Sequence, residues 1–125
     1  SSLKQSQNCF GTVVLKGARN IEEEISETYK SLTEHPLPNQ FIMSHDYHFG
    51  GYAKNNSSLI KFMRQFYKNT GIKTDPIYSG KLFYSLVDQL KTNKLFQNKT
   101  IVALHSGGIS GIKGFEKRYN LKIFN

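Results

Sequence analysis

Apolar and polar residues follow one another along this chain in two patterns, one typical of helices and one typical of short buried strands. A β-branched, apolar run at residues 11–16 predicts a first strand. A second apolar run, at residues 40–44 after two prolines, predicts another. The run T-I-V-A-L-H at residues 100–105 is the most strand-like segment of all. We therefore expect three strands buried within the fold.

Three segments with apolar residues at helical spacing lie between these strands. The first follows Asn20, a possible cap, and the second follows Asn56 or Ser57 and stops at Gly71. The third spans residues 81–92. Their apolar faces are Ile21, Ile25, Tyr29 and Leu32; Leu59, Phe62, Met63 and Phe66; and Leu82, Leu86, Val87 and Leu90.

Strands that alternate with helices predict an α/β fold with a mostly parallel sheet, in the three-layer α/β/α arrangement. Ligands of such sheets bind beyond the carboxyl ends of the strands. The length of 125 residues predicts one domain and no second core.

The composition excludes several classes of protein. With 38% hydrophobic and 21% charged residues, the chain is too apolar to be disordered. A single cysteine, Cys9, cannot form an internal disulfide, which disfavours a secreted, disulfide-rich scaffold. No apolar run reaches the length of a membrane span. We therefore expect a cytoplasmic protein.

The chain is basic, with 17 lysines and arginines against 9 acidic residues and a net charge of +8. This charge is compatible with nucleic acid, an anionic membrane surface or a phosphorylated small molecule as partner. The basic residues form no dense block, and no nucleic-acid-binding signature occurs. We expect neither nucleic acid nor a membrane among its partners.

The segment S-G-G-I-S-G at residues 106–111 follows the third predicted strand. Glycines allow the backbone to approach a ligand closely, and Ser106 can form a hydrogen bond with a polar group there. The segment lacks the spacing of a P-loop or of a dinucleotide fingerprint, so a plain tight turn explains it equally well.

Two further segments carry side chains capable of chemistry. D-P-I-Y-S-G-K at residues 75–81 is a rigid turn that presents a tyrosine and a serine, although a tyrosine packed at a loop corner is the simpler interpretation. His45, Asp46 and His48 suggest zinc, but no second cluster of ligands exists and Cys9 is remote in sequence. We therefore expect no metal site.

Taken together, these segments resemble a known family. The runs are L-K-G at 15–17, G-G-Y-A-K at 50–54, T-G-I-K-T-D-P-I-Y-S-G-K at 70–81 and H-S-G-G-I-S-G at 105–111. In order and spacing they resemble the C-terminal part of the 1-aminocyclopropane-1-carboxylate deaminase and D-cysteine desulfhydrase family. The resemblance extends from about residue 11 to about residue 115.

This resemblance implies a pyridoxal-phosphate-dependent enzyme of the tryptophan-synthase β-like fold (fold type II) that acts on a small amino acid. It implies that Tyr78 and Tyr52 are catalytic residues facing the substrate. The cofactor-binding residues that it implies are Ser106, beside the pyridine nitrogen, and Ser79, Gly107 and Gly108. Because a tyrosine has an ordinary pKa of about 10, either tyrosine needs a shift to act as a base at neutral pH.

Position 79 separates the branches of the family. Deaminases carry a glutamate there and desulfhydrases a threonine, so Ser79 favours the hydroxyl-bearing branch. The substrate therefore stays open between 1-aminocyclopropane-1-carboxylate and D-cysteine.

In this family the cofactor lysine lies in an asparagine-lysine motif near the N-terminus of a chain more than twice as long, with the phosphate-binding loop also upstream, and we expect this sequence to contain neither. We therefore expect residues 1–125 to be one incomplete α/β domain, the C-terminal portion of a longer enzyme, and inactive alone. The alternative is a non-catalytic α/β module that binds an anion or a partner. An incomplete sheet exposes an edge, so we also expect homo-oligomers.

Overall fold

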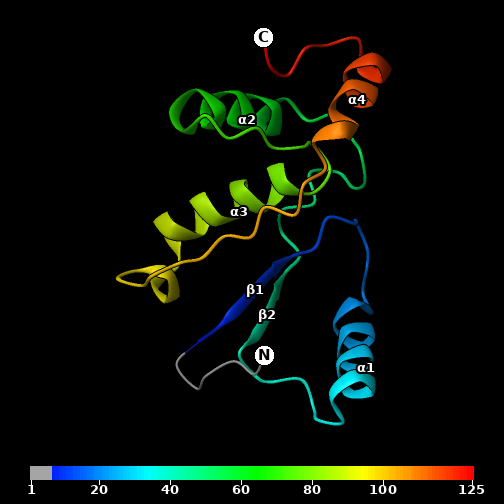
Figure 1. The fold of residues 1–125 in the computed structure, drawn as a ribbon, viewed down its shortest axis with the longest axis vertical. Coiled ribbons are helices and arrows are strands. Elements are labelled where there is room, and N and C mark those ends of the chain that lie inside the picture. Colours follow the sequence, from blue (N-terminus) through cyan, green and yellow to red (C-terminus); the bar gives the residue numbers. More distant parts are fainter. Residues whose placement is uncertain (1–6) are drawn as a thin grey trace.

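The computed structural model describes residues 7–125, so the first six residues of the predicted domain lie outside the described part. Strands β1 (Cys9–Thr12) and β2 (Phe41–Ser44) pair in parallel, with Cys9 opposite Phe41 and Thr12 opposite Ser44. Helix α1 (Ile21–Thr33) connects them, as a parallel pair requires a crossover (Figure 1). The chain is therefore of the α/β class, with a small parallel sheet.

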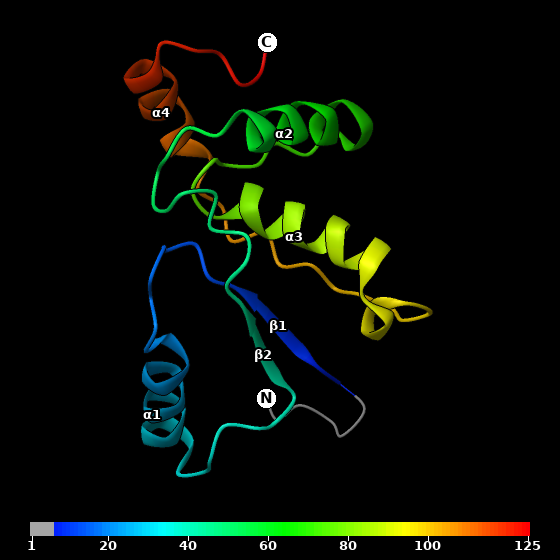
Figure 2. The ribbon, with the colours of Figure 1, turned by 180° about the vertical axis from the view of Figure 1, so that it is seen from behind.

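Three further helices lie toward the carboxyl ends of the strands: α2 (Ser57–Thr70), α3 (Ser79–Thr92) and α4 (Ile112–Tyr119). Two short 3-10 helices, Lys94–Phe96 and Ile109–Gly111, follow α3 and precede α4. Helix α3 contacts both β1 and α2, and it lies between the sheet and α2 (Figures 1 and 2). The start of α3 is thereby placed beside the loops that follow the two strands.

The ends of α2 follow the rules that its sequence predicts. The side chain of Asn56 accepts hydrogen bonds from the backbone N–H groups of Ser58 and Leu59, at 3.0 and 3.2 Å. Gly71 ends the helix with a left-handed φ of 72°, which glycine adopts at little cost. These bonds single out Asn56, rather than Ser57, as the capping residue.

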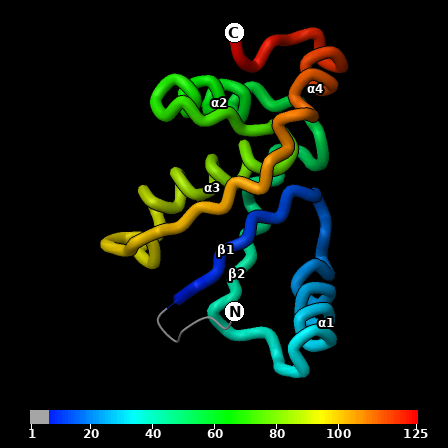
Figure 3. Tube along the Cα trace, in the orientation of Figure 1, coloured from blue at the N-terminus to red at the C-terminus, as the bar shows by residue number. Residues whose placement is uncertain are grey.

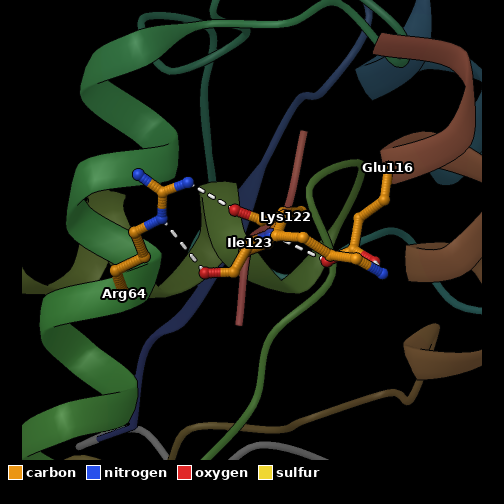
Figure 4. A network of polar contacts seen from close by, with 4 residues as sticks. All are labelled: Arg64, Glu116, Lys122 and Ile123. Carbon is orange, nitrogen blue, oxygen red and sulfur yellow. Dashed lines mark hydrogen bonds and ion pairs between the residues drawn. The ribbon is translucent and has the colours of Figure 1, made fainter. Parts of the chain in front are cut away.

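The hydrophobic core is formed by α2, α4 and the C-terminal segment. Its buried residues are Leu59, Ile60, Met63, Ile112, Phe115 and Ile123. Arg64 of α2 donates hydrogen bonds to the carbonyls of Lys122 and Ile123, while Glu116 of α4 accepts the N–H of Ile123 at 2.7 Å (Figure 4). These bonds hold the C-terminal segment between the two helices.

Several expectations about the strands were wrong. The first strand spans residues 9–12 rather than 11–16, and both strands are half-buried rather than buried. Residues 100–105 form no strand, and the side chains of Val102 and Leu104 are 93% and 77% exposed. A strand needs a neighbour for its backbone groups, and no strand within residues 7–125 pairs with this segment.

The trace in Figure 3 shows residues 98–106 crossing over α3 toward α4. There is accordingly a two-stranded sheet, and not the predicted three-layer α/β/α arrangement, within the described residues. The cap predicted for α1 is also missing, because Asn20 makes no side-chain hydrogen bond to that helix.

No helix among residues 7–125 has both the length and the apolar character that crossing a membrane requires. Over the same residues, no three His, Cys, Asp or Glu side chains are grouped as metal ligands would be.

Candidate functional site

The candidate site lies where α3 begins, beyond the carboxyl ends of both strands. Lys81, in the first turn of α3, donates hydrogen bonds to the carbonyl of Val14, at 3.2 Å, and to that of Gly51, at 2.7 Å. Val14 follows β1 and Gly51 follows β2. One side chain thus ties the loops after both strands to the start of α3, at the sheet edge where α/β proteins bind ligands.

The two tyrosines singled out in the sequence lie side by side at this place. The rings of Tyr52 and Tyr78 meet edge to face, with their centroids 6.0 Å apart. Tyr52 comes from the loop after β2 and Tyr78 from the turn before α3. Both rings are about half exposed, at 52% and 47%, so a molecule in solution can reach them.

The contact changes the acidity of one of the two phenols. The side-chain contact with Tyr52 raises the pKa of Tyr78 above its ordinary value; partial burial and the nearby charge of Asp75 act in the same direction. Tyr78 is therefore a neutral phenol at neutral pH. In this form it can donate a hydrogen bond or a proton, but it is not a base.

Asp75 organises the turn that carries Tyr78. Its carboxylate accepts hydrogen bonds from the N–H groups of Ile77, Tyr78 and Ser79, each at 2.8 Å, and from the Ser79 hydroxyl at 2.6 Å. The residue is 2% exposed. The sequence suggested only a rigid Asp-Pro turn. An aspartate directly before a proline commonly bonds to the backbone of the turn that follows, so a local signal for this role was present.

The loop at residues 106–108, which contains Gly107 and Gly108, contacts the same turn. A Cβ atom on Gly108 would stand 2.7 Å from the Asp75 carboxylate, so only glycine fits there. Gly107 and Gly108 have φ values of 98° and 84°, in the left-handed region that glycine favours. The ring of His105 accepts the N–H of Gly107 and bonds to the carbonyl of Lys73 at 2.8 Å. The loop is therefore fixed against the turn before α3.

The two serines occupy very different surroundings. Ser79 is fully buried, and its hydroxyl both donates to Asp75 and accepts the N–H of Asp75 at 2.8 Å. Ser106 is exposed, and its hydroxyl forms no hydrogen bond with residues 7–125. The hydroxyl that is free to meet a ligand is therefore that of Ser106, while that of Ser79 is already committed.

Lys81 is a functional candidate that sequence reasoning did not identify. Its side chain is completely buried, and this burial lowers the pKa of its amine, an effect that the charge of Asp75 partly offsets. A lysine near the start of a helix gives no local sign of burial. Only the tertiary fold places its amine against the carbonyls of Val14 and Gly51.

The chain is similar to curated proteins of one kind over much of its length, although no family model matches it. A Pyrococcus horikoshii protein, provisionally named 1-aminocyclopropane-1-carboxylate deaminase, is 40% identical over 102 residues, which are 82% of this chain and 29% of that protein. A Pyrococcus furiosus protein with the same name is 30% identical over 112 residues, which are 87% of this chain and 33% of that protein.

A third relative carries both activities in its name. The bifunctional D-cysteine desulfhydrase/1-aminocyclopropane-1-carboxylate deaminase of Arabidopsis thaliana is 36% identical over 63 residues, which are 50% of this chain and 16% of that protein. The chain thus spans about a third or less of the length of these three relatives. Similarity over most of the chain confirms the resemblance of its motifs, and the chain belongs to the 1-aminocyclopropane-1-carboxylate deaminase and D-cysteine desulfhydrase family.

Proposed function

We propose that this chain is the C-terminal portion of a longer pyridoxal-phosphate-dependent deaminase or lyase. In this proposal the parent enzyme has the tryptophan-synthase β-like fold and acts on a small amino acid of the 1-aminocyclopropane-1-carboxylate or D-cysteine type. The observation that carries the proposal is the pair of Tyr52 and Tyr78, reachable from solution at the start of α3, in a chain of this family.

The loop at residues 106–108 fits the aromatic ring of the cofactor. A Cβ atom on Gly107 would meet nothing within 4 Å, so the loop has open space on that side. The free Ser106 hydroxyl can bond to a pyridine nitrogen, and a neutral partner of this kind leaves the nitrogen largely unprotonated. Bound there, pyridoxal phosphate supplies an electron sink, while Ser106, Gly107 and Gly108 orient its ring.

The start of α3 does not fit the phosphate of the cofactor. The positive end of a helix commonly binds phosphate through free N–H groups. Here Asp75 already takes the N–H groups of Ile77, Tyr78 and Ser79, and its charge opposes a second anion. We propose that other parts of the longer enzyme bind the phosphate.

The tyrosine pair serves the substrate in this proposal. Tyr78 stays protonated at neutral pH, so it can deliver a proton or a hydrogen bond to the substrate. The edge-to-face contact with the Tyr52 ring keeps the Tyr78 ring in place. These roles differ from that of a tyrosine base, which would need a lowered pKa.

We expect the 125-residue chain alone to show no turnover, because no segment of it matches the motif that carries the family's cofactor lysine. Two asparagine-lysine pairs do occur, at residues 93–94 and 98–99, but they follow α3 and not a strand. The test is to incubate the chain with pyridoxal phosphate, to measure ammonia from 1-aminocyclopropane-1-carboxylate and sulfide from D-cysteine, and to map lysines labelled after borohydride reduction. Stoichiometric labelling of one lysine together with turnover would contradict the expectation.

The proposed function itself is tested on a longer protein. If the reading frame upstream of Ser1 encodes a strand followed by an asparagine-lysine pair, the extended protein should bind pyridoxal phosphate and release ammonia or sulfide. An extended protein that folds without binding the cofactor would overturn the proposal, and would leave the non-catalytic α/β module as the better interpretation.

We also propose that the chain self-associates through residues 100–104. Val102 and Leu104 expose apolar side chains on a segment of strand-like sequence that pairs with no strand of residues 7–125. Sedimentation velocity over a dilution series should show oligomers that Val102→Lys weakens. Leu32→Lys is the matched control, because Leu32 is 79% exposed on α1, away from this segment. A wild-type chain that stays monomeric at all concentrations would rule the proposal out.

A further inference from the structure

The backbone around Tyr52 adopts an unusual conformation. Phe49 and Ala53 both have a φ of 51°, and Gly50 and Gly51 between them have φ values of 88° and 119°. A left-handed φ is uncommon for residues other than glycine and costs free energy. This loop therefore needs support from the rest of the structure.

That support comes from two side chains, one on each side of Tyr52. The Lys81 amine donates to the carbonyl of Gly51 at 2.7 Å, and the Tyr119 hydroxyl donates to the carbonyl of Ala53 at 2.8 Å. Lys81 belongs to α3 and Tyr119 to α4. The backbone is thus held immediately before and immediately after the tyrosine that contacts Tyr78.

Lys81 also connects the two halves of the pair. It stands three residues after Tyr78, on the helix whose start carries that tyrosine, and its amine reaches the peptide that precedes Tyr52. A shift of either loop would therefore change the edge-to-face contact of the two rings.

The burial of Lys81 is hard to explain by packing alone. Its side chain has no solvent exposure, its partners are backbone carbonyls, and no carboxylate of residues 7–125 lies within ion-pair distance of it. A buried charge is costly, and an apolar side chain of similar volume often fills such a place equally well. A lysine at this position therefore fits a role in holding the loops.

We infer that Lys81 and Tyr119 are positioning residues that hold Tyr52 against Tyr78 from opposite sides. This inference rests on the proposed function only for its consequence, since the pair faces the substrate there. Neither residue contacts the cofactor or the substrate in this inference, and both act through the backbone of the Tyr52 loop.

The test removes one of the two supports without changing any charge. Tyr119→Phe deletes only the hydroxyl that bonds to Ala53. In the chain labelled with ¹³C at its tyrosine rings, the Tyr78 signal, assigned by its loss in Tyr78→Phe, reports the pKa of that phenol. Because the contact with Tyr52 is the main cause that raises this pKa, we expect it to fall toward the ordinary value of about 10 in Tyr119→Phe.

Tyr47→Phe provides the matched control. The Tyr47 hydroxyl donates to Asp88 at 2.7 Å, so this variant also loses one hydroxyl hydrogen bond of nearly the same length. Tyr47 lies earlier in the loop after β2, but its loss of a bond to Asp88 leaves the carbonyls of Gly51 and Ala53 with their own partners, so the pKa of Tyr78 should stay raised. The bond to Asp88 and burial raise the pKa of Tyr47 itself to about 12. The Tyr47 signal is identified because it disappears in Tyr47→Phe.

Lys81→Met removes the second support, and the direction of the resulting change in the Tyr78 pKa can be predicted. Removing a nearby positive charge would by itself raise the pKa of a phenol. A fall of the Tyr78 pKa in this variant therefore reports displacement of Tyr52. If the Tyr78 pKa stays raised in both Tyr119→Phe and Lys81→Met, with each variant folded by circular dichroism, the inference is overturned.

The titration requires neither cofactor nor substrate, so its result is independent of the proposed function. A fall of the Tyr78 pKa in Tyr119→Phe, in a chain whose extended form binds no pyridoxal phosphate, would support the positioning roles and overturn the proposed function. If the Tyr78 pKa is unchanged in Tyr119→Phe and Lys81→Met while the extended protein is active, the positioning roles are overturned and the proposed function is supported.

Discussion

Replacing Asp75 by alanine is expected to destabilise the chain by about 3 kcal/mol or more, because it leaves several buried donors without a partner. The carboxylate accepts four hydrogen bonds of 2.6 to 2.8 Å from the turn before α3. Water cannot replace them easily, since Asp75 and Ser79 are 2% and 0% exposed. Urea unfolding followed by circular dichroism measures the loss as a lower midpoint.

Two further variants sharpen this test. Asp75→Asn keeps one oxygen that can accept hydrogen bonds, so its loss should be smaller than that of the alanine variant. Asp46→Ala, at an exposed position, should change the free energy of unfolding by less than about 0.5 kcal/mol. A midpoint for Asp75→Ala equal to that of Asp46→Ala would show that the hydrogen bonds of Asp75 do not stabilise the turn.

Tyr78→Phe in the proposed longer enzyme should lower kcat by about a hundredfold or more, the usual scale of help from general acid–base catalysis. The change keeps the ring and its edge-to-face contact with Tyr52, and removes only the hydroxyl. Folding and the colour of the bound cofactor should therefore survive. Steady-state kinetics with each of the two candidate substrates measures the effect.

Ser106→Ala serves as the contrasting variant. Its proposed partner is the ring nitrogen of the cofactor, so this change should alter the absorption spectrum and the cofactor affinity as well as the rate. If kcat is unchanged in Tyr78→Phe, that residue is a packed corner tyrosine without a part in the chemistry.

The parts of the fold that depend on neighbouring residues were predictable. Helix α2 begins at its Asn56 cap and ends at Gly71, and β2 lies within the apolar run at 40–44, because caps and short apolar runs act locally. Helix α3 begins two residues before its predicted start, since the Asp75 turn leads directly into it. The motifs shared with the family singled out Tyr52 and Tyr78, but the contact between their rings became visible only in the structure.

The rest depends on contacts between distant segments. The strand at 100–105 was predicted from its composition, but β-structure requires a pairing partner, which residues 7–125 do not provide. The start of β1 was misplaced because its register is set by pairing with β2, and not by the most apolar residues. The bonds of Lys81 and Tyr119 to the Tyr52 loop join residues 30 and 66 positions apart in the sequence, so no local pattern predicts them.

Because Lys81 is fully buried, the rate at which its amine reacts reports local opening of the structure. Acylating reagents attack only an amine that they can touch, so exposed lysines such as Lys61 and Lys68 react from the folded state. The lowered pKa of Lys81 leaves more of its amine in the nucleophilic form, but its surroundings keep reagents away. Lys81 can therefore be acylated only when the start of α3 separates from the loops after β1 and β2. Mass spectrometry of acylation at Lys81 over time would thus measure how often these loops and α3 come apart.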